Sequence, residues 1–296
     1  MNITTLAENT LDKTRLTFIY CSSLESIILP NSLTEIDYGV FCGCESLKSI
    51  AIPDGVTAIG RVAFKNCTQL TEIDIPDSVI DIGEQAFSGT EWYANQPDGI
   101  VYAGKVAYNY KGEQPKEIDI KDGTLGIARG AFPSYDDTLE NVIIPDTVVN
   151  IGNYAFNNCK GLKSIIIPQS VTTIGVEAFG YYSPSPDVVL PVEGFTIYGY
   201  TGTAAHTYAD ENGFAFIDLN EHPMTLLGDV DSDREITILD ATTIQRHLVS
   251  LSTQMYNEEA ADCDSDEEVT IIDATCIQRH LAGIPTLAKG IGKPIV

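Results

Sequence analysis

Residues 47–53 read LKSIAIP, and the same pattern returns 23 residues later as LTEIDIP at 70–76. Three further copies, LESIILP, LENVIIP and LKSIIIP, occupy 24–30, 139–145 and 162–168. The same step carries phenylalanine, glycine and cysteine, so one unit reads L-x-x-I-x-I-P-x-x-V-x-x-I-G-x-x-A-F-x-x-C. Self-similarity at a fixed period of this kind indicates a repeat architecture.

Each unit is predicted to form one coil of a solenoid. The first leucine and the two following isoleucines give a short strand with one apolar face. The proline then ends the strand, because it has no N–H to donate to a sheet. One coil cannot bury its own apolar face, so neighbouring coils must stack, and the expected result is a repeat solenoid with short parallel strands.

Composition excludes several classes of function. The chain has 296 residues, with 42 acidic against 17 basic, and its net charge of −25 argues against binding to nucleic acid or anionic lipid. No apolar run approaches the length of a membrane span. The first residues, MNITT at 1–5, contain neither a basic nor an apolar leader region, so no signal peptide is expected in this chain.

The array is interrupted at 91–112, a segment that is dense in aromatic residues. Its glycines predict a hairpin inserted beside the array. The unit near 118–132 is degenerate, with Lys121 in place of the proline, and 192–219 is predicted to cap the array with a short helix at 204–213. Two interpretations of the aromatic residues remain open, a hairpin core and a stacking platform for carbohydrate: Trp92, Tyr93, Tyr102, Tyr108 and Tyr110.

Two further sets of residues follow the repeat register. Four cysteines, Cys21, Cys44, Cys67 and Cys159, hold the same place in their units and are expected to be buried thiols, since no C-x-x-C pair suggests a metal site. A second set should face outward from the strands as a stripe suited to protein contact: Ile28, Ala51, Asp74, Ile143 and Ile166, with Ser26, Ser49, Glu72, Asn141 and Ser164 beside them.

The repeat pattern closely resembles the bacterial surface leucine-rich repeats of the BspA type. The resemblance covers roughly residues 16–219. It implies an extended surface that recognises another molecule, rather than a catalytic cleft.

A second pattern begins after residue 220. The segment DVDSDREITILD at 229–240 recurs 33 residues later as DCDSDEEVTIID at 262–273, and an Ile-Gln-Arg-His-Leu stretch follows each copy. Acidic residues at loop positions 1, 3, 5 and 12, with a backbone carbonyl at position 7, form the oxygen cage that calcium requires. The predicted ligands of two calcium ions are Asp229, Asp231, Asp233, Glu235, Asp240, Asp262, Asp264, Asp266, Glu268 and Asp273.

This duplicated loop and exiting helix resembles a dockerin over residues 226–285. The resemblance implies a small all-α module with two EF-hand-like motifs, which binds a cohesin domain of a scaffoldin in a cellulosome, outside the cell. It also implies that positions 10 and 11 and the helices contact cohesin: Ile238, Leu239, Gln245, Arg246, His247, Ile271, Ile272, Gln278, Arg279 and His280. Arg234 and Glu267 stand where EF-hands have a glycine, at an expected cost of about 1–2 kcal/mol in a left-handed conformation.

These patterns predict a solenoid at 1–219, a linker at 220–225, a dockerin at 226–287 and a tail at 288–296. They favour a secreted, non-catalytic protein whose dockerin anchors it to a scaffold and whose repeats hold a protein or cell-surface ligand. The alternatives are a carbohydrate-binding component that uses the aromatic insertion, and a hydrolase without a visible motif. No G-x-S-x-G, H-E-x-x-H or phosphate-binding glycine loop occurs in the sequence.

Overall fold

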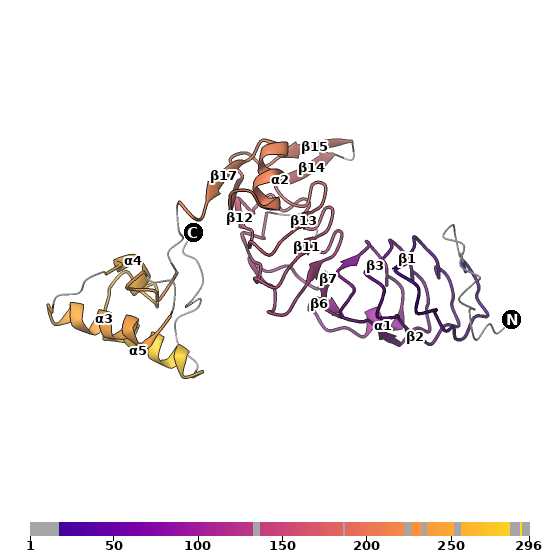
Figure 1. Cartoon of the computed structure of the whole chain (residues 1–296), viewed down its shortest axis with the longest axis horizontal. Coiled ribbons are helices and arrows are strands. Elements are labelled where there is room, and N and C mark those ends of the chain that lie inside the picture. The colour runs from indigo at the N-terminus through magenta and orange to yellow at the C-terminus, as the bar shows by residue number, and fades with distance from the viewer. Residues whose placement is uncertain are drawn as a thin grey trace. The chain divides into compact units, whose positions relative to one another are not determined.

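The computed structural model of the chain describes residues 18–132, 137–185, 187–221, 226–232, 236–251, 256–284 and 291. It contains two compact units, which divide between Asp218 and Leu219 (Figure 1). None of the helices in these ranges has the length and apolar run that crossing a lipid bilayer requires.

The first unit is the predicted solenoid, in which each regular coil contributes two short strands. One set of strands comes from the L-x-x-I-x-I segments, the degenerate unit and the C-terminal cap: β2 (Ser49–Ala51), β4 (Glu72–Asp74), β8 (Glu117–Asp119), β10 (Asn141–Ile143), β12 (Ser164–Ile166), β16 (Thr196–Gly199) and β17 (Ala215–Asp218). The other set ends at the last isoleucine of each unit, before the glycine or the residue that replaces it: β1 (Glu35–Ile36), β3 (Ala58–Ile59), β5 (Asp81–Ile82), β9 (Gly126–Ile127), β11 (Asn150–Ile151) and β13 (Thr173–Ile174).

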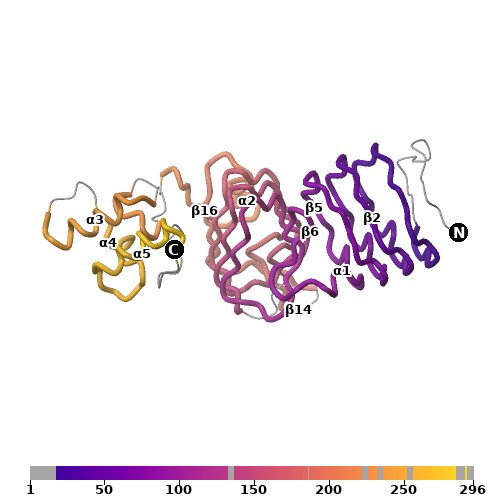
Figure 2. The backbone as a smooth tube through the Cα atoms, turned by 90° about the horizontal axis from the view of Figure 1, so that it is seen from below, coloured from indigo at the N-terminus to yellow at the C-terminus, as the bar shows by residue number. Residues whose placement is uncertain are grey.

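Strands from neighbouring coils pair in parallel. The register follows the repeat, since Ser49 pairs with Glu72 and Ala58 with Asp81, each exactly one unit further along the chain. The strands form the sheets β1-β3-β5, β2-β4, β10-β8 and β12-β16-β17, and a five-stranded sheet that ends in β9-β11-β13. Figure 2 shows the coils of the N-terminal part stacked side by side.

A column of stacked phenylalanines fills the centre of the array. The rings of Phe41 and Phe64 lie 5.3 Å apart and nearly parallel, and Phe64 and Phe87 repeat this geometry at 5.6 Å. All three side chains are almost fully buried. Their backbones also join the coils, because Phe41 N–H donates to Ala63 O and Phe64 N–H to Ala86 O, both at 2.8 Å.

The aromatic insertion belongs to the array, and the prediction that it lies beside the array was wrong. After a short helix α1 (Glu91–Ala94), strands β6 (Gly99–Ala103) and β7 (Val106–Lys111) form the predicted antiparallel hairpin. Strand β7 then pairs in parallel with β9, so the hairpin ends the sheet β13-β11-β9-β7-β6. A strand that carries several buried residues satisfies its backbone by joining an existing sheet.

Two tyrosine hydroxyls replace the hydrogen-bond acceptors that a following coil would provide. Phe87 has no regular coil after it, and its N–H donates instead to the hydroxyl of Tyr108 at 3.0 Å. Phe179 lies at the end of the array, and its N–H donates to the hydroxyl of Tyr208 at 3.5 Å. Both tyrosines are buried, so each hydroxyl occupies the place that an alanine carbonyl holds in a regular coil.

The C-terminal end of the array carries a short helix. Helix α2 (Ala204–Asn212) ends at Gly213, which has a φ of 70°, and Tyr208 of this helix packs on Phe179. Before the cap, strands β14 (Tyr181–Ser185) and β15 (Val188–Pro191) form a second antiparallel hairpin, which the sequence did not indicate.

The cysteine register holds for three of the four positions. The thiols of Cys44, Cys67 and Cys159 are buried and donate to the carbonyls of Phe18, Phe41 and Phe132 at 3.0–3.2 Å. Cys21 is exposed, so the expectation of burial was wrong for it. The exposure of the predicted outward residues also varies. Ile28, Ala51 and Asp74 are exposed, whereas Ile143 and Ile166 are half-buried.

The second unit contains helices α3 (Ile238–Leu248), α4 (Glu258–Ala261) and α5 (Ile271–Leu281). Helices α3 and α5 pack together around a small core that includes Val230, Ile244, Cys263 and Ile277. The short helix α4 enters the second loop, although the sequence indicated no entering helix. Ile291, which the sequence places in a tail, is buried in this core.

We predict that Tyr108→Phe lowers the free energy of unfolding of the repeat unit by about 1–3 kcal/mol, because it leaves the buried N–H of Phe87 without an acceptor. Tyr110→Phe, in the same strand, is the matched control and should change stability by less than about 0.5 kcal/mol. Thermal or urea unfolding of both variants measures the difference. Equal stabilities would show that the hydroxyl of Tyr108 does not hold the end of the coil stack.

Candidate calcium-binding and partner-binding site

The two acidic loops are closed by buried aspartates at position 12. Asp240 accepts hydrogen bonds from Val230 N at 2.7 Å and Asp231 N at 3.3 Å. Asp273 accepts the same pair of bonds from Cys263 N and Asp264 N, at 2.7 and 3.3 Å. Both aspartates have no solvent exposure, so the carboxylate that ends each loop also holds its beginning.

The same aspartates start the helices. Thr237 and Thr270 are the N-caps of α3 and α5, and each is followed three residues later by the buried aspartate, which accepts from the threonine N–H at 2.7–2.8 Å. This reciprocal arrangement is a capping box, which satisfies N–H groups that the helix itself cannot. The sequence contains this signal as T-x-x-D at 237–240 and 270–273.

Each loop brings three aspartates together. The carboxylate oxygens of Asp229, Asp231 and Asp240 lie within 4.8 Å of one another, and so do those of Asp262, Asp264 and Asp273. Ligands of one calcium ion lie up to about 5 Å apart, because each calcium–oxygen distance is about 2.3–2.6 Å. The spacing and the all-oxygen donor set therefore fit this ion.

The charge of the second cluster also favours a bound cation. Oδ1 of Asp264 is buried and has no hydrogen-bond donor among the described residues. Burial raises the pKa of Asp264, and the neighbouring carboxylates of Asp273, Asp266 and Asp262 raise it further. A bound cation would relieve this repulsion.

The structure does not bring all the predicted ligands into these clusters. Asp266 is exposed and accepts a hydrogen bond from Glu268 N at 3.0 Å. The side chain of Glu268 is also exposed, in keeping with a ligand role for its backbone carbonyl alone. The predicted ligands Asp233 and Glu235 lie outside the described residues, as does Arg234 at position 6.

Position 6 of the second loop has the expected strain. Glu267 adopts a φ of 70°, in the left-handed region that favours glycine. In this conformation, the N–H of Glu267 donates to Oδ2 of Asp262 at 3.0 Å. The turn brings the backbone back onto the first acidic residue of the loop.

The apolar residues at positions 10 and 11 face solvent in both copies. Ile238 and Leu239 are 55% and 58% exposed, and Ile271 and Ile272 are 56% and 48% exposed. They occupy the first turns of α3 and α5, directly after the threonine caps. The packing of the second unit therefore leaves two equivalent apolar surfaces uncovered within the described residues.

The helix residues predicted to contact a partner lie on less uniform surfaces. Gln245 and Gln278 are half-buried, whereas Arg246, His247, Arg279 and His280 are exposed. The copies differ at histidine, because His247 stacks on Tyr256 with ring centroids 3.8 Å apart. No ring contact of His280 is present in the described part of the chain.

Comparison with known families identifies both units. Residues 14–132 and 101–201 match the BspA type leucine rich repeat region, in six copies. The chain belongs to this family. Residues 227–282 match the dockerin type I domain, so the repeats are followed by a dockerin, a module that binds cohesin. Neither module is catalytic, and no enzyme family matches.

Solved bacterial leucine-rich repeat proteins are similar to this chain. A leucine-rich repeat protein from Bacteroides ovatus is 32% identical over 57% of this chain and 44% of its own, with a TM-score of 0.26. A leucine rich cell surface protein from Faecalibacterium prausnitzii is 21% identical over 68% of this chain and 67% of its own, with a TM-score of 0.29. The chain thus spans less than half of the first protein, and no curated protein matches it.

We predict that Glu267→Gly strengthens calcium binding by the second loop, because glycine removes the cost of a left-handed residue, about 1 kcal/mol or somewhat more. Glu267→Gln is the matched control, since it removes the charge and keeps the strain. Calcium titration by calorimetry should show tighter binding for the glycine variant than for the glutamine variant. If the two variants bind alike, the backbone strain does not limit this loop.

Proposed function

We propose that this protein is a secreted, non-catalytic subunit of a cellulosome, anchored by two calcium ions and a scaffoldin cohesin. The observation that supports this most strongly is the agreement between the two acidic loops. Hydrogen bonds to Asp240 and Asp273 match within about 0.1 Å, and both loops leave two apolar residues exposed at the start of the exiting helix. Each copy therefore offers cohesin the same combination of a calcium-ordered loop and an apolar contact.

The proposed calcium ligands are the two aspartate clusters, together with Asp233, Asp266 and the carbonyls of Glu235 and Glu268. The proposed cohesin contacts are Ile238 with Leu239 and Ile271 with Ile272. The helix residues beside them complete this surface: Gln245, Arg246, His247, Gln278, Arg279 and His280.

The repeats supply the recognition surface in this proposal. The strands β2 and β4 present exposed, polar side chains on a regular sheet, which suits contact with a protein or cell-surface ligand. A carbohydrate platform has less support, because Tyr108 is buried and the other aromatic residues of the insertion are half-buried against the core. Through the cellulosome, the protein would take part in polysaccharide breakdown by positioning other components.

Removal of calcium should abolish cohesin binding and unfold the dockerin, because the clustered carboxylates repel one another and metal binding provides folding free energy. Excess chelator added to the full chain is expected to remove the helical circular dichroism signal. The strand signal of the repeats should remain. Cohesin binding that persists in chelator, measured by interferometry, would contradict the calcium-dependent part of the proposal.

Charge substitutions on the apolar pairs test whether either copy can bind cohesin. We predict that Ile238→Asp with Leu239→Asp weakens binding less than the same change in both copies, because Ile271 and Ile272 can substitute for the lost contact. The reciprocal variant, Ile271→Asp with Ile272→Asp, is the matched comparison, and calorimetry measures all three. If one pair alone removes all binding, only that copy contacts cohesin.

A further inference from the structure

Strand β4 has one edge that no other strand covers. Glu72 and Asp74 direct their backbone groups to β2, as shown by Glu72 N–H donating to Lys48 O at 3.4 Å and Asp74 O accepting from Ile52 N at 2.9 Å. Alternate residues of a strand direct these groups to opposite edges, so Ile73 presents its N–H and C=O on the other side. Within residues 18–132, neither group has a hydrogen-bond partner.

The aromatic insertion leaves only the middle of this edge open. Trp92 N–H donates to Leu70 O at 2.7 Å before β4, and Gly104 lies against the backbone of Ile75 after it, so Ile73 keeps the uncovered groups. Helix α1 follows the coil of β4 at the point where the next coil would place its strand, and the next strand of this set, β8, pairs with β10 instead. An uncovered edge with free N–H and C=O groups is a template for pairing with another chain.

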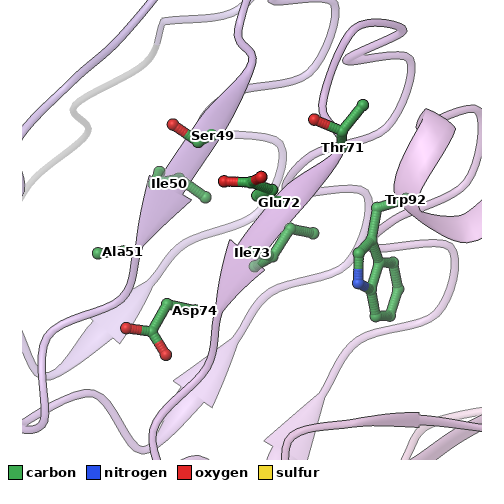
Figure 3. A pocket seen from close by; sticks show the side chains of 8 residues that line it. All are labelled: Ser49, Ile50, Ala51, Thr71, Glu72, Ile73, Asp74 and Trp92. Atoms are coloured by element: carbon green, nitrogen blue, oxygen red, sulfur yellow. The ribbon is translucent and has the colours of Figure 1, made fainter.

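A shallow groove of about 500 Å³ crosses the β2-β4 sheet from Ser49 and Ala51 and reaches Trp92 beyond the edge of β4. Ile73 and Trp92 line it from two sides, and the indole nitrogen of Trp92 lies on the side of the ring that faces β4 (Figure 3). Trp92 is half-buried, and its indole N–H donates to no described residue. The groove therefore offers main-chain hydrogen-bonding groups, one aromatic face and one free donor.

The charge of the groove indicates what can occupy it. Glu72 and Asp74 are exposed on the outer face of β4, and neither forms an ion pair with a described residue. They are two residues apart, so their carboxylates are separated by about 7 Å along the strand. An added strand has the same spacing between alternate side chains, and it would match these carboxylates with basic residues at every second position.

We propose that the repeats bind an extended segment of a protein ligand as an added strand on β4, with lysine or arginine at alternate positions and an apolar residue between them beside Trp92. Backbone groups of the segment would pair with Ile73, and its basic side chains with Glu72 and Asp74. This inference rests on the proposed function only in taking the repeats as the part that recognises a protein.

Trp92 is the only tryptophan of the chain, so its fluorescence reports on this groove directly. The probe is the blocked heptapeptide STKVKTS, titrated into the calcium-loaded full chain, with the acidic peptide STEVETS as control. We expect a saturable change in Trp92 emission with the basic peptide alone. Adjacent residues of a strand direct their N–H groups to opposite edges, so only one of two neighbouring N–H groups of the peptide can bind β4. Methylation of the backbone nitrogen is therefore tested at valine and at the second lysine separately. It should abolish binding at one of these positions and leave binding unchanged at the other.

Two variants separate the groove from general electrostatic attraction. Glu72→Gln with Asp74→Asn should bind the basic peptide roughly tenfold more weakly, as expected for the loss of two exposed ion pairs. Asp54→Asn, an exposed carboxylate in a turn outside the groove, should leave binding unchanged.

Three results would overturn the strand proposal: no emission change at millimolar basic peptide, equal binding of the acidic peptide, or a response to a neutral cello-oligosaccharide in place of the peptide. Cohesin binding is measured on the same samples. If cohesin binds and the peptide does not, the strand site alone is rejected. If cohesin does not bind, the anchoring function is rejected.

Discussion

Each coil of the solenoid depends on the next one for a partner to its buried backbone. The side chains of Phe41, Phe64, Phe132 and Phe156 are fully or almost fully buried, and the N–H of each donates to an alanine carbonyl of the following coil. The array cannot stop or be interrupted without a replacement acceptor. Tyr108 at the insertion and Tyr208 at the cap provide one with a side-chain hydroxyl, and this explains why both positions are aromatic and buried.

The dockerin meets a similar requirement with carboxylates. Asp240 and Asp273 each accept N–H groups from the beginning of the loop and from the helix N-cap, so one buried side chain fixes both ends of a loop. A carboxylate can do this and still offer lone pairs to a metal ion. The acidic clusters and the helix starts are therefore one structural element, and in the proposed function this element would link calcium binding to the order of the exposed pairs at positions 10 and 11.

The sequence was most informative where the period of 23 applied. It predicted the strands and most of the buried thiols, because the same contacts recur in each coil. It could not place the insertion, since alternating aromatic residues do not reveal which sheet edge β7 will join. The role of Tyr108 depends on a contact with Phe87, 21 residues away, and the burial of Ile291 on a contact across a segment without any pattern. The capping boxes were visible as T-x-x-D and were missed.

In the proposed function, calcium orders the dockerin and leaves the repeats unchanged. Amide hydrogen exchange of the full chain, followed with and without calcium, tests it residue by residue. Calcium should slow exchange at Val230, Asp231, Cys263 and Asp264, whose N–H groups bind the two buried aspartates, and should not alter exchange at Phe41 or Phe64. Unchanged exchange at the four loop amides, or slower exchange throughout the repeats, would contradict the account.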